Sequence, residues 1–255
     1  MSLSSAINEI KFKSTFWSVA NLVSPLQPQK IRCISREQFK QLKHTGFIKL
    51  EALFGIDDLV KVQQEITQIM NLGQVMQDGH YEKRSGNLKI KHLQNYSVFL
   101  NDFRSHPVFR YFSLMFYGWY KRPTILYSVT SDKYNGSKFV DGDCDKQIAS
   151  EPHIDSYKNY LKIIILLSDV DENNGPTTMV NSSINHPIMR AHYEKKASDK
   201  TAGLLSRADA NKVVKDCGTS KLIGNAGDIY IVNTKNLHWA GSFKKGIREI
   251  LWLYY

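Results

Sequence analysis

The residues with the clearest chemical potential are a histidine and an aspartate two positions apart, His153 and Asp155. Successive side chains of an extended strand point to opposite faces, so these two would share one face while Ile154 points the other way into packing. An imidazole and a carboxylate on one face can hold a divalent metal ion. The spacing alone is weak evidence, because His-X-Asp also occurs as an ordinary surface pair.

A third ligand has to come from elsewhere in the chain, and His238 is the best candidate. Two histidines and one carboxylate can occupy one face of an octahedral iron ion and leave the other coordination positions open. Ten positions after His238 comes Arg248, inside a strand-like run over residues 247–255. Its guanidinium could hold the carboxylate of a ligand through two parallel hydrogen bonds.

The order of the elements around these residues supports the prediction of a metal site. The apolar run 161–167 follows the His-Asp pair, and its lack of alternation predicts a central strand buried on both faces. A polar turn follows at residues 169–176. Further along, Gly227-Asp228 precede the apolar run 229–232, which predicts another strand before the distal histidine.

This order resembles the phytanoyl-CoA dioxygenase-like family of iron(II)/2-oxoglutarate oxygenases. The family pattern is His-X-Asp, a strand ending in an Asp-Val-Asp-Glu-Asn-Gly-Pro type of turn, a strand opened by Gly-Asp, a distal histidine and a later arginine. The corresponding parts of this chain are His153-Ile154-Asp155, residues 169–176, Gly227-Asp228, His238 and Arg248. An early family segment also has a counterpart at residues 39–47, followed by Asp57-Asp58-Leu59, so the resemblance runs from about residue 36 to the end.

The resemblance implies a mainly β fold, a double-stranded β-helix of the jelly-roll or cupin type, with N-terminal helices supporting one face. It implies Fe(II) held by His153, Asp155 and His238. It further implies 2-oxoglutarate as co-substrate, its distal carboxylate paired with Arg248, and O2 as oxidant. Such a site would hydroxylate, or otherwise oxidise, an unactivated C–H bond.

Two more residues are candidates for contacts with the co-substrate. Ser156 follows the predicted carboxylate ligand, and Tyr127 lies in a run of strand formers. The alternation of side chains along a strand is equally compatible with a packing role for these residues. Two departures from the family pattern concern the same contacts. Residues 181–184 replace a Pro-Gly-Ser-His type of segment, and Ala240 stands where the family often has serine.

Composition and charge narrow the class of protein and of partner. The three cysteines, Cys33, Cys144 and Cys217, are scattered, which favours a reducing compartment, and we expect a cytoplasmic protein. The chain has no apolar run long enough to span a membrane. A net charge of +10 favours an acidic partner, such as a phosphate-bearing carrier or an anionic metabolite. The basic residues are spread along the chain, so we expect no nucleic-acid partner.

The chain is expected to contain one catalytic unit with an extension. Residues 1–33 are predicted to form an N-terminal extension and residues 34–255 a single oxygenase domain. Helices are predicted over residues 57–70 and 107–117 from their apolar stripes. The polar insert at residues 184–224 is expected to wall the substrate pocket.

Three functions are compatible with these residues. The first is an oxygenase acting on a small-molecule or carrier-linked substrate. The second is a non-catalytic binding module, the same barrel with a degenerate pocket, which the departures at residues 181–184 and Ala240 motivate. The third is a metal-dependent enzyme of another sort, such as a cupin isomerase, whose activity would not require Arg248.

Overall fold

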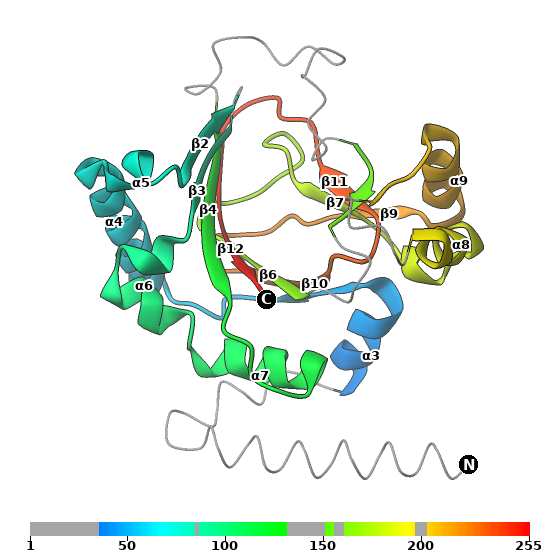
Figure 1. Cartoon of the computed structure of the whole chain (residues 1–255), viewed down its shortest axis with the longest axis horizontal. Helices are drawn as coiled ribbons and strands as arrows, with labels where there is room; N and C mark the ends of the chain where they lie inside the picture. Colours follow the sequence, from blue (N-terminus) through cyan, green and yellow to red (C-terminus); the bar gives the residue numbers. More distant parts are fainter. Residues whose placement is uncertain (1–35, 85–86, 132–150, 156–160, 197–202) are drawn as a thin grey trace.

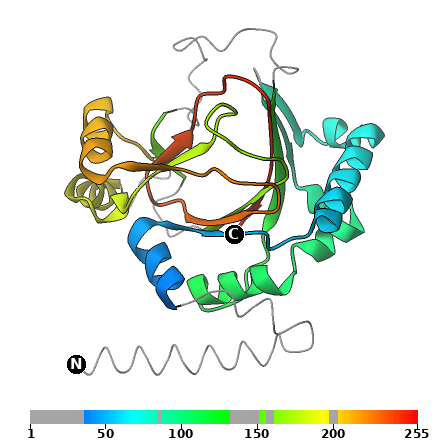
Figure 2. The same ribbon diagram turned by 180° about the vertical axis from the view of Figure 1, so that it is seen from behind.

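The computed structural model describes residues 36–84, 87–131, 151–155, 161–196 and 203–255. The N-terminal extension predicted over residues 1–33 and the candidate Ser156 lie outside these described residues. The described part of the chain builds two β-sheets that face each other, with helices outside both of them (Figure 1; Figure 2).

The two sheets share the strands unequally. The larger sheet has the order β1 (Phe47–Leu50), β10 (Ile229–Asn233), β6 (Leu161–Leu166), β12 (Ile247–Tyr254), β4 (Thr124–Ser131), β3 (Asn87–Lys91) and β2 (Tyr81–Arg84). The smaller sheet has the order β8 (Gly203–Leu204), β5 (His153–Ile154), β11 (His238–Ala240), β7 (Thr177–Val180) and β9 (Thr219–Lys221). From β4 to β12, most connections lead from a strand of one sheet to a strand of the other. Neighbouring strands pair antiparallel. This arrangement confirms the predicted double-stranded β-helix.

Strand β6 lies in the middle of the larger sheet, between β10 and β12. Ile163 and Ile165 pack on the side of the helices, whereas Ile164 and Leu166 pack toward the smaller sheet. Both faces of β6 are therefore buried, which explains why its sequence is a continuous apolar run and confirms the prediction of a central strand.

Helices cover the outer face of the larger sheet. Those on its side are α3 (Arg36–Thr45), α4 (Ile56–Leu72), α5 (Gln74–Gln77), α6 (Val98–Phe103) and α7 (Pro107–Tyr117), with the short 3-10 turn η1 (Leu93–Asn95). The other described helices are α8 (Pro187–Lys196) and α9 (Arg207–Cys217), preceded by the 3-10 turn η4 (Ser183–Asn185). The predicted stripe of α4 is buried against the sheet. Helix α7 has the predicted bounds. Among the described helices, none combines the length and apolar character needed to cross a bilayer.

Helices α8 and α9 lie beside the smaller sheet, on the opposite side of the molecule from α4 (Figure 1). Met189 of α8 and Val213 of α9 pack in one cluster with Ile154 and Leu237. Because Ile154 points away from the barrel interior, these helices cover the outer face of the smaller sheet. The described helices of the predicted insert over residues 184–224 thus lie outside the smaller sheet, and the insert also contains strands β8 and β9 of this sheet.

A buried carboxylate ties the first strand to the barrel. Asp228, directly before β10, accepts hydrogen bonds from the backbone amides of Ala52 at 3.0 Å and Asn225 at 2.9 Å. The ammonium of Lys49 on β1 lies 2.8 Å from the same carboxylate. Burial by itself would raise the pKa of Asp228, but Lys49 and the two amides hold that pKa below its ordinary value.

We expect Asp228→Asn to lower the free energy of unfolding at neutral pH by about 1–3 kcal/mol, because buried donors lose a charged acceptor. A depressed carboxylate pKa contributes stability that is present above the ordinary value of 3.8 and is lost as the pH falls through the folded-state pKa. The variant should therefore lose less stability than the wild type on acidification. Urea unfolding at several pH values measures both effects. Glu51→Gln, which changes an exposed partner of the same lysine, is the matched control, and an equal loss in both variants would contradict the assignment.

Candidate metal centre

The structure places the two predicted histidine ligands opposite each other on neighbouring strands. In the antiparallel pairing of β5 with β11, His238 is the register partner of His153. Ile154, Leu237 and Trp239 pack on the outer face of this sheet. Since side chains alternate along a strand, both imidazoles project inward, toward the larger sheet.

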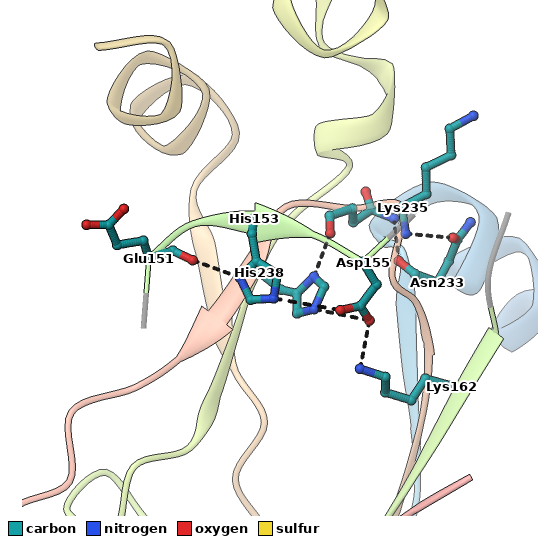
Figure 3. A network of polar contacts seen from close by, with 8 residues as sticks. Glu151, His153, Asp155, Lys162, Asn233, Lys235 and His238 are labelled. Atoms are coloured by element: carbon teal, nitrogen blue, oxygen red, sulfur yellow. Dashed lines mark hydrogen bonds and ion pairs between the residues drawn. The ribbon is translucent and has the colours of Figure 1, made fainter. Parts of the chain in front are cut away.

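The two imidazoles lie next to each other, with ring centres 4.5 Å apart, and the Asp155 carboxylate lies beside the pair (Figure 3). Its Oδ1 is 3.7 Å from His153 Nε2, and its Oδ2 is 3.6 Å from His238 Nε2. One ligand atom from each of the three residues lies within 4.8 Å of the others. Within the described residues, no other cluster of histidine, cysteine or carboxylate side chains brings three ligand atoms so close.

Backbone carbonyls determine which nitrogen of each imidazole faces this centre. His153 Nδ1 lies 2.8 Å from the carbonyl oxygen of Glu151, and His238 Nδ1 lies 2.9 Å from that of Asn236 (Figure 3). A carbonyl only accepts, so each Nδ1 carries a proton, and in the neutral ring the lone pair is on Nε2, on the side of the carboxylate. This tautomer is the one that a metal ion requires from both rings.

Burial and neighbouring charges put His153 and Asp155 in the protonation states of metal ligands. Burial, together with the neighbouring His238 ring, lowers the pKa of His153 to about 4. Burial alone would raise the pKa of Asp155, but Lys162 and His238 hold it well below its ordinary value. At neutral pH the site therefore offers a neutral imidazole and an ionised carboxylate, and the donor set fits a divalent ion such as iron.

Asn236 holds the loop that carries His238. Its side chain is fully buried, and its Oδ1 accepts hydrogen bonds from Ser183 Oγ at 3.2 Å and from the Ile184 amide at 3.1 Å. A Cβ added at Gly46, where φ is +92°, would lie 2.2 Å from the Asn236 amide nitrogen, so only glycine fits beside it. Residues 181–184, which depart from the family pattern, thus supply two of the donors that support the distal histidine.

Arg248 is a buried cation whose contacts are with neutral groups. One terminal nitrogen donates to the carbonyl of Gly175, and the other donates to Thr130 Oγ1 at 3.1 Å. Its Nε has no hydrogen-bond partner among the described residues, and no described carboxylate influences its pKa. Burial lowers the pKa of Arg248 to about 10, so the group is still charged at neutral pH. A buried, uncompensated guanidinium is suited to an anionic ligand.

The orientation of Tyr127 on β4 differs from the one that its predicted contact with the co-substrate requires. Tyr127 packs in the core beneath the helices, as does Leu251, its register partner. Thr130, whose hydroxyl accepts from Arg248, projects from the other face of β4. Tyr127 is therefore on the wrong side of its strand for the predicted contact, because side chains separated by an odd number of positions face opposite ways.

The residue that sequence reasoning missed is Lys162, at the start of β6. Its side chain is buried, and its Nζ lies 2.7 Å from Asp155 Oδ2 (Figure 3). The ammonium also lies over the rings of Trp252, at 4.7 Å from the ring centre, and Tyr254, at 4.4 Å. The signal in the sequence was a single lysine within an otherwise apolar central strand.

We expect Asn236→Ala to weaken binding of a divalent metal by about 10- to 100-fold, because His238 loses the support of its loop. Calorimetric titration of each protein with Co(II) measures the affinity. Asn181→Ala is the matched control, since it removes an amide whose Oδ1 accepts from Ser220, away from the three ligands. Unchanged affinity in Asn236→Ala, with the fold retained, would show that the network does not position the histidine.

Comparison with known proteins gives matches in structure only. The sequence matches no family model and no curated protein. The non-heme alpha-ketoglutarate-dependent carbocyclase SnoK from nogalamycin biosynthesis is similar in structure, with a TM-score of 0.61 and 14% identity over 88% of this chain and 85% of SnoK.

Two further solved structures hold ligands. EctD from S. alaskensis, with 2-oxoglutarate and 5-hydroxyectoine, has a TM-score of 0.63 and 12% identity over 87% of this chain and 75% of EctD. HygX from Streptomyces hygroscopicus, with nickel, 2-oxoglutarate and hygromycin B, has a TM-score of 0.57 and 15% identity over 87% of this chain and 86% of HygX. At these identities the likeness shows that the chain shares the fold of these proteins.

Proposed function

We propose that this protein is an Fe(II)- and 2-oxoglutarate-dependent oxygenase that hydroxylates, or otherwise oxidises, an unactivated C–H bond. The observation that supports it most strongly is the convergence of His153, Asp155 and His238, with one ligand atom from each within 4.8 Å. The buried, unpaired cation of Arg248 supplies the second part of such a site. The shared fold with SnoK, EctD and HygX supports the same assignment.

Each residue has a defined role in this proposal. His153, Asp155 and His238 hold Fe(II), which with 2-oxoglutarate and O2 supplies the oxidation of the C–H bond. Arg248 binds the distal carboxylate of 2-oxoglutarate, because its guanidinium can form two parallel hydrogen bonds with that group. Ser156, which follows Asp155 in the sequence, is also proposed to contact the co-substrate.

The barrel interior next to these residues is apolar. Ile164, Ile250 and Met179 from three strands pack in one cluster between the sheets, and each is almost fully buried. Such a lining excludes water, and in a dry environment the charges of the ligands and of Arg248 act more strongly on bound groups. The protein would thereby favour oxidation of a bound substrate over reaction with solvent.

The substrate is proposed to be a small molecule or a carrier-linked acyl group. The similar structures include proteins that hold 5-hydroxyectoine or hygromycin B, which are small molecules. The net charge of +10 favours an anionic substrate or carrier. We further propose a cytoplasmic location, from the scattered cysteines, and a place among the phytanoyl-CoA dioxygenase-like enzymes, from the sequence pattern.

We expect Fe(II) and 2-oxoglutarate, added together without oxygen, to produce a weak visible charge-transfer band that His153→Ala abolishes. With oxygen, the wild type should form succinate even without its substrate, at an uncoupled rate. Absorption spectroscopy and succinate analysis measure these outcomes. Absence of the band and of 2-oxoglutarate binding in the metal-loaded wild type would refute the oxygenase assignment, while 2-oxoglutarate binding without succinate under any substrate would favour the binding module.

We expect Arg248→Met to weaken 2-oxoglutarate binding by about 30-fold or more, because a buried charge pair loses one partner. Affinity for Co(II) alone should change little, since Arg248 is not a ligand of the metal. Calorimetric titration of the Co(II)-loaded proteins with 2-oxoglutarate tests this. Intact metal-dependent activity in the variant would instead favour a metal enzyme that uses no such co-substrate.

A further inference from the structure

Lys162 adds a positive charge to a site that is expected to bind a positive ion. Its ammonium is 2.7 Å from Asp155 Oδ2, the oxygen that also lies 3.6 Å from His238 Nε2. Lysine ordinarily carries a positive charge at neutral pH, and this side chain is buried. A fixed cation therefore competes with a metal ion for the same carboxylate.

The charges of the site are balanced before any metal arrives. The acidic and basic side chains at the centre are the Asp155 carboxylate and the Lys162 ammonium, whose opposite charges lie 2.7 Å apart. The ammonium repels a dication that enters this buried site. The metal-loaded site also carries a net positive charge, which is unfavourable where the effective dielectric constant is low. An anion bound at the same time would remove this cost.

The lysine has partners that let it stay in place when the metal engages Asp155. Trp252 and Tyr254, on the interior face of β12, present their ring faces to the ammonium at 4.7 and 4.4 Å. Cation–π contacts stabilise a desolvated ammonium without supplying negative charge. The cation is thus retained beside the metal position, free to pair with an anionic ligand of the metal.

We propose that Lys162 couples metal binding to binding of an anionic co-ligand. Without the anion, Lys162 engages Asp155 and weakens the hold on the metal; with the anion, Lys162 pairs with it and the metal binds tightly. The inference rests on the proposed function, since it concerns the same metal site. Binding linkage is reciprocal, so the metal must strengthen anion binding by the same factor.

The experiment uses Co(II) as the metal and oxalate as the anion, measured by calorimetry on the full chain. Oxalate is a chelating dianion without a distal carboxylate for Arg248, so its effect isolates Lys162. In the wild type, oxalate should strengthen Co(II) binding by about tenfold or more. Lys162→Met should bind Co(II) alone about tenfold more tightly than the wild type, and oxalate should then strengthen binding by about tenfold less.

Two variants separate charge from other effects. Lys162→Gln removes the charge but keeps a hydrogen-bond donor beside Asp155, so it should behave as Lys162→Met does, and it serves if the methionine variant does not fold. Lys235→Met is the matched control, because Lys235 lies over the ring of Tyr193 at 4.5 Å and does not contact the three ligands. It should bind Co(II) and oxalate as the wild type does.

The outcomes separate this inference from the proposed function. Equal or weaker Co(II) binding in both Lys162 variants would overturn the inference, since Lys162 would then merely support Asp155. An undiminished effect of oxalate in these variants would overturn it as well. If the wild type binds Co(II) and 2-oxoglutarate in either case, the proposed function stands; if it binds neither, both fail.

Discussion

The candidate site depends on the register of one short backbone pairing, that of β5 with β11, which sets His238 opposite His153. A shift of one residue would turn the distal histidine to the outer face, where Leu237 and Trp239 now pack. The apolar outer face thus opposes a shift, because a slip would exchange buried apolar and polar side chains. Asn236 adds a second constraint by holding the loop just before His238.

Two buried cations, each with a different partner, dominate the electrostatics of the barrel interior. Lys162 is paired with a carboxylate and two aromatic rings, whereas Arg248 contacts a carbonyl and a hydroxyl. A buried charge without an opposite charge beside it is unfavourable, and an anionic ligand would compensate that of Arg248. Two of the chain's positive charges, Lys162 and Arg248, thus lie in the barrel interior, where an anionic ligand could pair with them.

Both buried cations project from strands of the larger sheet, Lys162 from β6 and Arg248 from β12. Arg248, Ile250 and Trp252 follow one another at every second position of β12, a period that directs all of them toward the smaller sheet. The opposite face of the same strand, including Leu251 and Leu253, is packed beneath the helices. Because the strand is buried on both faces, the positions of its charged and aromatic side chains are closely defined.

The sequence by itself determined the local structure and the types of the candidate ligands. The apolar stripe of α4, the central strand β6 and the alternation along β12 follow from periodicity, and His153, Asp155, His238 and Arg248 stood out by type and spacing. Only the tertiary structure decided contacts between distant segments. It set Lys162 against Asp155, turned Tyr127 away from the interior and placed the insert helices outside the smaller sheet, because strand pairing and packing across the barrel are not encoded in local periodicity.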